Sequence, residues 1–389
     1  MNYFLLYFAL YFGSTPTSIE PAFETQIIDD KVAIGYGLAI GDVDGDGKPD
    51  ILLADKDQFV WYRNGDWKRF VMVDNLTESD NVCIAARDIN GDGKVEVAVG
   101  AQWNPGETSD MAKSGSVHYL IRPEDPTQLW TPVALPHEPT VHRMRWAKTG
   151  IDSYQLIMAP LHGRGNKGGE GVGVRIIAYE MPKDPTAPWK VQVVDESMHM
   201  THNLDVIPEG DGETVYIGGK EGVKAFTYSQ GKWAPHPNGP WIAEGHGFGE
   251  LRIGKEKDSS RFLAGIEPIH GNLLTTYRSS NGSFTAAELQ RDVLSETLNQ
   301  GHGLAAADLL GMGEDQLVVG WREPNDAGEI GVQLFIPKAD KTWEKIWIDQ
   351  GGMACEDLQV ADLNGDGKPD IIAAGRSTNN LKIYWNNSQ

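Results

Sequence analysis

A short acidic stretch decides how the chain can fold: Asp42-Val43-Asp44-Gly45-Asp46-Gly47-Lys48-Pro49-Asp50. It leads into the apolar run ILLA at 51–54, and close copies occur at 88–96 (DINGDGKVE) and 362–370 (DLNGDGKPD). Side-chain oxygens at positions 1, 3, 5 and 9 of a glycine-bent loop suit a hard cation such as Ca²⁺. An EF-hand loop would lead into a helix and end in a glutamate. A strand follows here, so the motif indicates a repeated calcium-binding β-turn.

The expected calcium ligands are the oxygen-bearing side chains of these three loops: Asp42, Asp44, Asp46, Asp50, Asp88, Asn90, Asp92, Glu96, Asp362, Asn364, Asp366 and Asp370. A degenerate copy at 308–315 has Leu310 at position 3, where the other loops carry an oxygen ligand. We therefore expect no full calcium site in that loop.

Composition and charge narrow the class of protein. The chain has 389 residues, 45 of them Gly and 12 Trp, and many short apolar runs, which favours an all-β protein. Its net charge of −21 makes nucleic acid or an anionic membrane surface a poor partner. Only Cys83 and Cys355 are present, so a disulfide scaffold is not expected.

The N-terminus has the features of a leader. Residues 4–12 (FLLYFALYF) form an apolar run followed by GSTP, which has signal-peptide length and is too short for a transmembrane helix. We expect residues 1–19 to be a signal peptide and the protein to be exported, to the periplasm, the surface or the medium. The basic segment that usually precedes such a run is missing, so a membrane-retained or mis-started N-terminus is the alternative. No later segment is predicted to span a bilayer.

A common frame of four short strands recurs along the chain. Copies begin near residues 35, 81, 142, 202, 246, 302 and 355. The seventh copy lacks its fourth strand, and residues 23–29 (FETQIID) resemble the closing strands at 190–195 (KVQVVD) and 345–349 (KIWID). We therefore predict one domain over 23–389, an all-β, seven-bladed β-propeller whose last blade is closed by the N-terminal strand; six or eight blades are the alternatives.

The frame also gathers side chains on the face opposite the calcium loops. Strand 1 of each copy starts there and strand 2 ends there, so these positions should surround a pocket at the axis. Histidine recurs at this register, and the candidate catalytic residues are His142, His162, His202, His246, His270 and His302. The candidate substrate-binding residues are Tyr36, Trp103, Arg164, Glu267, Trp321, Arg322 and Glu356. Any single histidine is more often a turn cap than a ligand, but a repeated one favours a functional site.

Histidines beside arginines and a glutamate suit proton abstraction next to a carbonyl or carboxylate. A neutral histidine takes the proton, and an arginine or a metal ion holds the developing anion. Two or three histidines could bind a divalent metal, zinc or similar, and a second histidine or Tyr36 could protonate the leaving group. That sequence is a β-elimination, as in sugar dehydratases and polysaccharide lyases.

Two resemblances agree with this interpretation. The loop with its following strand resembles the FG-GAP or VCBS repeat of integrin-like and bacterial exported propellers. The segments 161–164 (LHGR), 200–203 (MTHN), 245–250 (GHGFGE) and 301–304 (GHGL) resemble the propeller domain of aldos-2-ulose dehydratase and are similar to propeller lyases that cleave rhamnose-glucuronate linkages. The resemblance implies β-elimination on a keto-sugar or uronic acid, with the histidine pocket as active site. The fungal dehydratase also has cupin domains, for which this sequence has no room, so its isomerising step is not expected here.

Two other functions stay open. A non-catalytic calcium-binding propeller that binds glycans or proteins is the general expectation for such repeats, although it leaves the histidines unexplained. A glycoside hydrolase would need two facing carboxylates, for which Glu250, Glu267 and Glu356 are the candidates.

Overall fold

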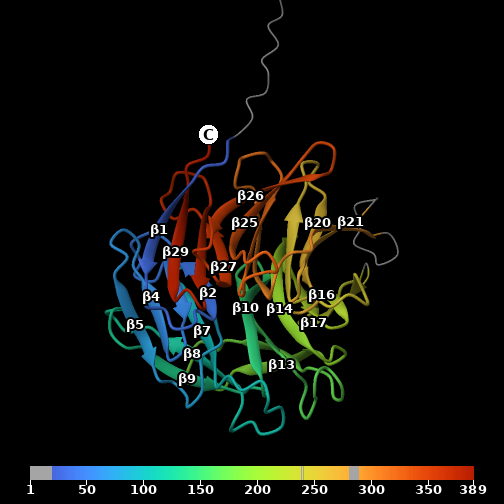
Figure 1. Cartoon of the computed structure of the whole chain (residues 1–389). Helices are drawn as coiled ribbons and strands as arrows, with labels where there is room; N and C mark the ends of the chain where they lie inside the picture. The colour runs from blue at the N-terminus through green and yellow to red at the C-terminus, as the bar shows by residue number, and fades with distance from the viewer. Residues whose placement is uncertain (1–19, 238, 240, 280–288) are drawn as a thin grey trace, which may run out of the picture.

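The structure is a computed structural model that describes residues 20–237, 239, 241–279 and 289–389. Within these ranges every regular element is a β-strand, and the strands form seven antiparallel sheets around an axis (Figure 1). The all-β, seven-bladed prediction is confirmed. The predicted signal peptide, residues 1–19, lies outside the described residues. No helix in the described chain is long and apolar enough to cross a membrane.

The first three blades follow the chain in order. Blade 1 contains β2 (Gly37–Gly41), β3 (Asp50–Ala54), β4 (Gln58–Tyr62) and β5 (Arg69–Asp74). Blade 2 contains β6 (Cys83–Arg87), β7 (Glu96–Ala101), β8 (Ser116–Ile121) and β9 (Thr131–Leu135). Blade 3 contains β10 (Val141–Gly150), β11 (Ser153–Pro160), β12 (Ile176–Glu180) and β13 (Lys190–Asp195).

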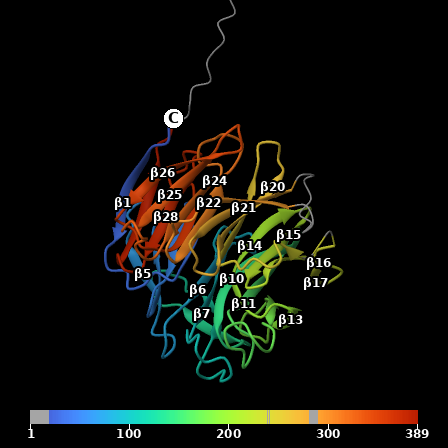
Figure 2. The same ribbon diagram turned by 45° about the vertical axis from the view of Figure 1, so that its right-hand side comes forward.

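Three further blades follow along the chain, and blades 4 and 5, on the right of Figure 1, come forward in the turned view of Figure 2. Blade 4 contains β14 (Thr201–Glu209), β15 (Gly212–Gly219), β16 (Gly222–Ser229) and β17 (Lys232–Pro235), with the short β18 (Trp241–Ile242) also paired to β16. Blade 5 contains β19 (Glu250–Lys255), β20 (Arg261–Glu267), β21 (Leu273–Ser279) and β22 (Leu289–Ser295). Blade 6 contains β23 (Gly301–Ala307), β24 (Gln316–Trp321), β25 (Gly331–Pro337) and β26 (Trp343–Gln350).

Blade 7 is built from both ends of the chain. It contains β27 (Cys355–Ala361), β28 (Asp370–Gly375), β29 (Asn380–Asn386) and, as its outer strand, β1 (Phe23–Asp29). Phe23 pairs with Asn386, and β1 lies beside β29 in Figure 1. The predicted closure by residues 23–29 is confirmed. The pairing covers the outer edge of β29, which would otherwise be exposed.

The core lies between blades. Seven clusters of buried apolar residues each join two neighbouring sheets. Leu52 and Trp61 of blade 1 pack with Val97 and Trp130 of blade 2, for example. Because second strands such as β3 are covered on both faces, they are continuous apolar runs instead of alternating ones. Each blade depends on its neighbours, which holds the inner strands in fixed positions around the axis.

The three acidic loops share one backbone conformation. The carboxylate of Asp42 accepts hydrogen bonds from the amides of Gly45 and Gly47 at 2.6 and 2.8 Å, and Asp50 accepts one from the amide of Val43 at 2.8 Å. Both glycines have φ near +84°, which favours glycine. Equivalent bonds hold the loops at 88–96 and 362–370. Ligand oxygens of Asp42, Asp44 and Asp50 lie within 4.8 Å of one another, a spacing compatible with one cation.

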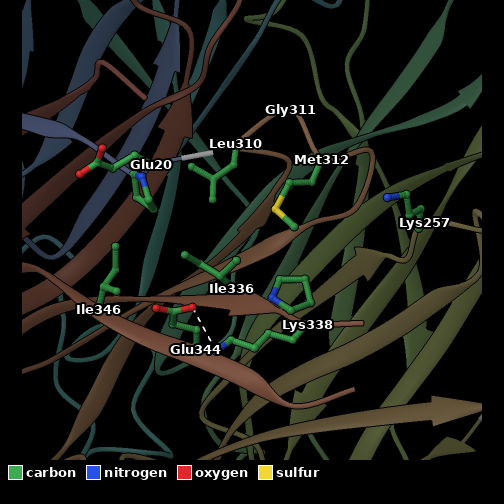
Figure 3. A pocket seen from close by; sticks show the side chains of 11 residues that line it. Glu20, Lys257, Leu310, Gly311, Met312, Ile336, Lys338, Glu344 and Ile346 are labelled. Atoms are coloured by element: carbon green, nitrogen blue, oxygen red, sulfur yellow. Dashed lines mark ion pairs between the residues drawn. The ribbon is translucent and has the colours of Figure 1, made fainter. Parts of the chain in front are cut away.

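The degenerate loop of blade 6 keeps the turn with different chemistry. Asp308 accepts hydrogen bonds from the amides of Met312 and Gly313, and Gln316 accepts one from Leu310, as a neutral counterpart of Asp50. Leu310 and Met312 replace oxygen ligands and line a cavity of about 720 Å³ with Ile336 and other residues (Figure 3). An ion pair of 3.1 Å between the side chains of Lys338 and Glu344 borders this cavity.

Candidate functional site

Irregular residues at the starts of the inner strands build the site. In β14, Thr201 pairs with Gly219 and Asn203 pairs with Gly218, so His202 between them has no strand partner. His142 in β10, His302 in β23 and Glu356 in β27 occupy the same extra position. A bulge of this kind turns a side chain out of the regular alternation. Here it directs these four side chains towards the axis.

Backbone carbonyls of the next blade fix the histidine tautomers. Nδ1 of His142 lies 2.7 Å from the carbonyl oxygen of His202, and Nδ1 of His202 lies 2.6 Å from that of Gly249. Nδ1 of His302 bonds the carbonyl of Glu356. A carbonyl can only accept, so each Nδ1 carries the proton and each Nε2 keeps its lone pair. The three imidazoles are thus prepared to accept a proton or bind a metal through Nε2.

Blade 5 departs from the sequence prediction. In blade 5, Leu251 pairs with Gly265, as the equivalent Leu304 of blade 6 pairs with Val319. The axis residue of blade 6, His302, lies two residues before Leu304. The equivalent axis position of blade 5 is therefore Gly249, not His246. The predicted ring position of His246 was wrong. Its side chain is 44% exposed, with Nδ1 3.5 Å from a carboxylate oxygen of Glu267.

His270 fills the space that Gly249 leaves. It comes from the turn after β20 and has φ of +53°. A Cβ on Gly249 would lie 2.9 Å from the backbone nitrogen of His270 and 3.2 Å from Cα of Ile269. The missing side chain in blade 5 is therefore what allows a histidine to enter from a loop.

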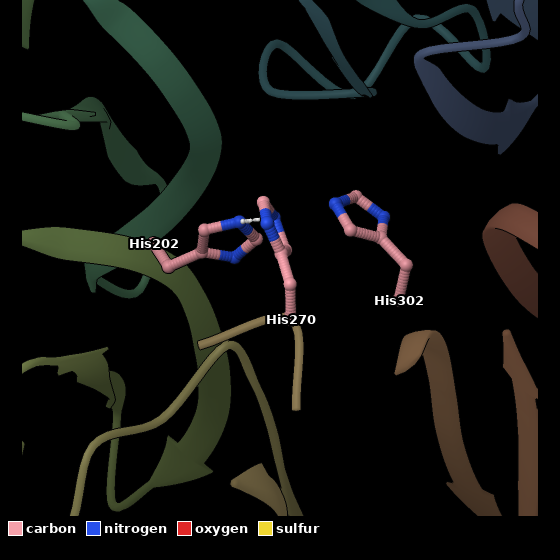
Figure 4. A group of neighbouring side chains, drawn as sticks. All are labelled: His202, His270 and His302. Carbon is pink, nitrogen blue, oxygen red and sulfur yellow. Dashed lines mark hydrogen bonds between the residues drawn. The ribbon is translucent and has the colours of Figure 1, made fainter. Parts of the chain in front are cut away.

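Three histidines converge in the cluster shown in Figure 4. Nε2 of His270 lies 2.7 Å from Nε2 of His202, and one ligand nitrogen from each of His202, His270 and His302 lies within 4.8 Å of the others. Nε2 of His302 is buried and has no hydrogen-bond partner among the described residues. Since Nε2 of His202 is an acceptor, Nε2 of His270 must donate to it. Ring nitrogens this close could bind a zinc-type ion if the ion replaced the hydrogen bond between His202 and His270 and the proton of His270 moved to Nδ1.

Burial and neighbouring cations keep these rings neutral. Burial, followed by the charge of Arg143, lowers the pKa of His142 and His202 well below its usual value. Burial and Arg322 do the same to the pKa of His302, and burial, with His202 next, lowers the pKa of His270 to about 2. Neutral imidazoles retain the lone pairs that proton abstraction or metal binding requires.

A cavity of about 220 Å³ opens onto this cluster. Four of the predicted substrate-binding residues line it: Tyr36, Trp103, Arg322 and Glu356. The ring centroid of Trp103 lies 5.0 Å from that of His142. The hydroxyl of Tyr36 donates to Asp80 at 2.9 Å, and burial, with Asp80, raises the pKa of Tyr36. The cavity is small for a drug-sized ligand, for which about 300–1,000 Å³ is usual, and its size suits a single small polar unit.

Glu356 is held between two arginines. Nε of Arg322 lies 2.7 Å from one carboxylate oxygen, and its Nη2 donates to the other at 2.9 Å. Nη1 of Arg376 lies 3.2 and 3.3 Å from the two oxygens. Glu356 is also the one acidic residue among those that line the cavity. The pocket therefore lacks the facing carboxylate pair that the glycoside-hydrolase alternative requires.

Besides His246 and His302, four predicted residues do not line this cavity: Trp321, Arg164, His162 and Glu267. Trp321 is 1% exposed, donates from Nε1 to the carbonyl of Glu329 and packs on Trp347, so it is not accessible to a substrate, contrary to its prediction as a substrate-binding residue. Arg164 forms an ion pair with the buried Glu138. His162 is half-buried, its backbone forms a bridge with Met200, and burial lowers its pKa.

Glu267 has a supporting position instead of a substrate-facing one. Its carboxylate accepts hydrogen bonds from the hydroxyls of Thr275 and Tyr277, each at 2.6 Å, and from Arg291 at 2.7 Å. These bonds anchor the start of the turn that carries His270.

Sequence reasoning missed Arg143 and Gly249. Arg143 lines the cavity, is 4% exposed and donates from Nη1 to the carbonyl of His142 at 3.1 Å. No carboxylate lies within ion-pair distance of it in the described chain. An arginine directly after an axis histidine in a buried strand was the signal available for it. Gly249 gave no signal, because its effect is the space it leaves.

Comparisons with known proteins agree with this architecture. The family described as FG-GAP-like repeat matches residues 35–99, and the family described as aldos-2-ulose dehydratase, beta-propeller domain, matches residues 114–280. Aldos-2-ulose dehydratase of Phanerodontia chrysosporium is 26% identical over 275 residues, which cover 64% of this chain. The chain spans only 30% of the length of that relative.

Solved structures share the fold at low sequence identity. A chain in the crystal structure of BBS1N in complex with ARL6DN, soaked with mercury, has a TM-score of 0.57 at 14% identity, covering 94% of this chain and 96% of that one. A chain in the crystal structure of the Mitotic Checkpoint Complex has a TM-score of 0.56 at 10% identity, covering 99% of both. Together with the blade count, they show that the chain is a seven-bladed β-propeller, which resembles an FG-GAP-like repeat over residues 35–99 and the propeller domain of aldos-2-ulose dehydratase over residues 114–280.

Proposed function

We propose that this protein is an exported carbohydrate lyase or dehydratase that performs β-elimination on a keto-sugar or a saccharide containing uronic acid. One observation carries the proposal: the axis histidines His142, His202 and His302 are neutral, with Nδ1 bound to a carbonyl and the lone pair on Nε2. The similarity to aldos-2-ulose dehydratase supports a carbohydrate substrate and a lyase reaction.

The residues can be given roles in this reaction. Nε2 of His142, beside Trp103 at the cavity, takes the proton from the carbon next to the carbonyl or carboxylate. Arg322 and Arg376 stabilise the negative charge that develops. The carbon–oxygen bond at the next carbon then breaks as the double bond forms. Tyr36, whose raised pKa keeps it protonated, gives its proton to the leaving oxygen.

A divalent metal ion fits the same pocket. His202, His270 and His302 would hold it, because their donor nitrogens lie within 4.8 Å and two of the rings are oriented by carbonyls through Nδ1. Such an ion, zinc or similar, supplies a Lewis acid that polarises the substrate oxygen. His142 remains outside this set and is free to act as the base.

The test is product formation. Keto-sugars and uronic-acid oligosaccharides are incubated with the purified protein, and the unsaturated product is followed by its ultraviolet absorbance. We expect His202→Ala and His302→Ala each to lower kcat/KM at least about 100-fold, while His236→Ala, which changes a histidine paired with Glu209 outside the cavity, leaves it unchanged. Circular dichroism confirms that each variant is folded. Full activity in both pocket variants would rule out this site.

The second candidate is a non-catalytic propeller that binds glycans or proteins. The FG-GAP-like match at residues 35–99 favours it, since that match covers two of the acidic loops and no axis histidine. It predicts saturable glycan binding with no new product in the same assay.

Export is tested separately by sequencing the N-terminus of the protein recovered outside the cytoplasm, where we expect cleavage near residue 19.

A further inference from the structure

The charges around the axis do not cancel. The cavity is lined by Arg143, Arg322 and Arg376 and by a single carboxylate, that of Glu356. The next acidic side chain, that of Asp80, accepts a hydrogen bond from the hydroxyl of Tyr36 at 2.9 Å. The lining thus holds three arginines against one carboxylate, the histidines are neutral, and the buried Arg143 has no carboxylate of the described chain within ion-pair distance. A binding site with an uncompensated buried charge favours a ligand of opposite charge.

The excess charge is accessible from the cavity. Arg376 is the open member of the set, with 39% of its side chain exposed, and it meets Glu356 through Nη1 alone. Its guanidinium carbon lies 5.6 Å from the ring centroid of Tyr36, next to the proposed proton donor. Arg143 is buried, with Nη1 3.5 Å from Nε2 of His142. A carboxylate entering the cavity would meet the half-exposed Arg376 and the buried Arg143 among its lining residues.

We infer that the site takes a sugar unit that carries a carboxylate, a uronate, in preference to a neutral keto-sugar, and that Arg376 determines this specificity. The inference rests on the proposed elimination. Removing a proton beside a carboxylate produces a dianion, whereas removing one beside a ketone produces a monoanion. The uronate reaction therefore needs more fixed positive charge in the pocket.

The step balances without an oxidant or reductant. The base Nε2 of His142 takes the proton from the carbon that bears the carboxylate. The electron pair left there is held on the carboxylate oxygens and then forms the double bond to the adjacent carbon, whose bond to the leaving oxygen breaks. Tyr36 protonates that oxygen. Solvent afterwards removes the proton from His142 and restores that of Tyr36.

The experiment has a binding arm and a turnover arm. Isothermal titration calorimetry compares D-glucuronate with its methyl ester and D-glucose, and a kinetic assay compares a uronate oligosaccharide with its methyl-esterified form. We expect Arg376→Gln to weaken glucuronate binding and raise KM for the uronate at least about tenfold, with the ester little affected. Arg376→Lys should retain part of the preference. Arg63→Gln is the matched control, because Arg63 is 36% exposed and pairs with one acid, Asp66, on the blade 1 surface.

Each outcome separates the inference from the proposed function. Equal binding of glucuronate, ester and glucose, or an unchanged preference in Arg376→Gln, overturns the inference even if a neutral keto-sugar is converted. Glucuronate binding that depends on Arg376 supports the anionic site even if no product forms, in which case the proposed lyase activity is what fails. Loss of preference in Arg63→Gln would show that general surface charge is responsible and would also overturn the inference.

Discussion

Gly249 shows how one missing side chain can shape a site. Blades 3, 4 and 6 place a histidine at the axis position, and blade 5 places Gly249 there, so that His270 can enter from a turn. His202 bonds both sides of this arrangement, through Nδ1 to Gly249 and through Nε2 to His270. The metal-binding geometry proposed for the cluster thus depends on a residue with no side chain of its own.

Gly249→Ala should displace His270, because the new Cβ would lie 2.9 Å from its backbone nitrogen. We expect a loss of about 1–3 kcal/mol in the free energy of unfolding and at least about tenfold weaker zinc binding, measured by urea unfolding and metal titration. Gly37→Ala is the matched control, since its Cβ would meet its nearest atom, Cα of Cys83, at 3.4 Å. Unchanged zinc binding in Gly249→Ala would contradict the role given to this glycine.

At this scale the sequence predicted some residues and missed others for physical reasons. His142, His202 and His302 were found because their register repeats. His246 was misplaced because the segment GHGF at 245–248 mimics GHGL at 301–304. Phe248 in fact fills the space above Gly265, whose Cβ would lie 2.3 Å from its ring, and the strand begins only at Glu250. Packing decided the register there, and packing is not visible in a short motif.

Among the elements, the acidic loops connect blades as well as strands. The side chain of Asn64 in blade 1 donates to the carbonyl of Leu363 in the blade 7 loop at 2.8 Å, and Asn386 in blade 7 donates to Leu309 in the blade 6 loop at 2.7 Å. Arg122 of blade 2 donates to the carbonyl of Val43 in the blade 1 loop at 3.1 Å. Each loop therefore fixes its neighbour, and ordering one loop should stabilise the next.

Calcium should raise the stability of the molecule through these loops. Three sites at calcium 100-fold above Kd would each add about 2.7 kcal/mol to the free energy of unfolding, so a chelator should lower Tm by several degrees. Asp44→Ala should remove part of this response, because Asp44 belongs to the cluster with Asp42 and Asp50.

Asp308→Ala serves as the control for the calcium experiment. This substitution lies in the loop that has Leu310, Met312 and Gln316 at positions where the other loops have calcium-ligand candidates. The response of the variant to calcium should therefore equal that of the wild type. Differential scanning calorimetry with and without chelator measures both variants. If the chelator leaves the Tm of the wild type unchanged, the loops are not metal sites.

For the whole molecule, the ring should tolerate new ends but not the loss of its closing strand. The amide of Glu20 lies 3.2 Å from the carbonyl oxygen of Gln389, so these residues can be linked and the chain reopened at the exposed Gly210 turn between β14 and β15. We expect this permutant to melt within a few degrees of the wild type. Deleting residues 20–29 should lower Tm by more than about 5 °C and cause association through the exposed edge of β29.

Thermal unfolding and light scattering distinguish these two variants. A deletion variant that stays monomeric with an unchanged Tm would show that β1 is dispensable.

The blade count and this closure were predictable because the loop motif fixes the repeat frame, and residues 23–29 match the outer strands at 190–195 and 345–349. The chemistry of the pocket was less predictable from the sequence, because Arg143 and Glu267 take their roles from partners far along the chain.

The pairing of β1 with β29 also bears on how the protein is made. A ribosome produces residues 23–29 long before residues 380–386, yet these strands are hydrogen-bonded partners. The ring cannot be sealed until residues 380–386 have been made, and a chain interrupted before them keeps an unpaired β1 and an uncovered face of blade 1. Closure therefore acts as a check on synthesis of the propeller: only a chain that contains both strands can cover the surfaces by which chaperones and proteases recognise unfinished proteins.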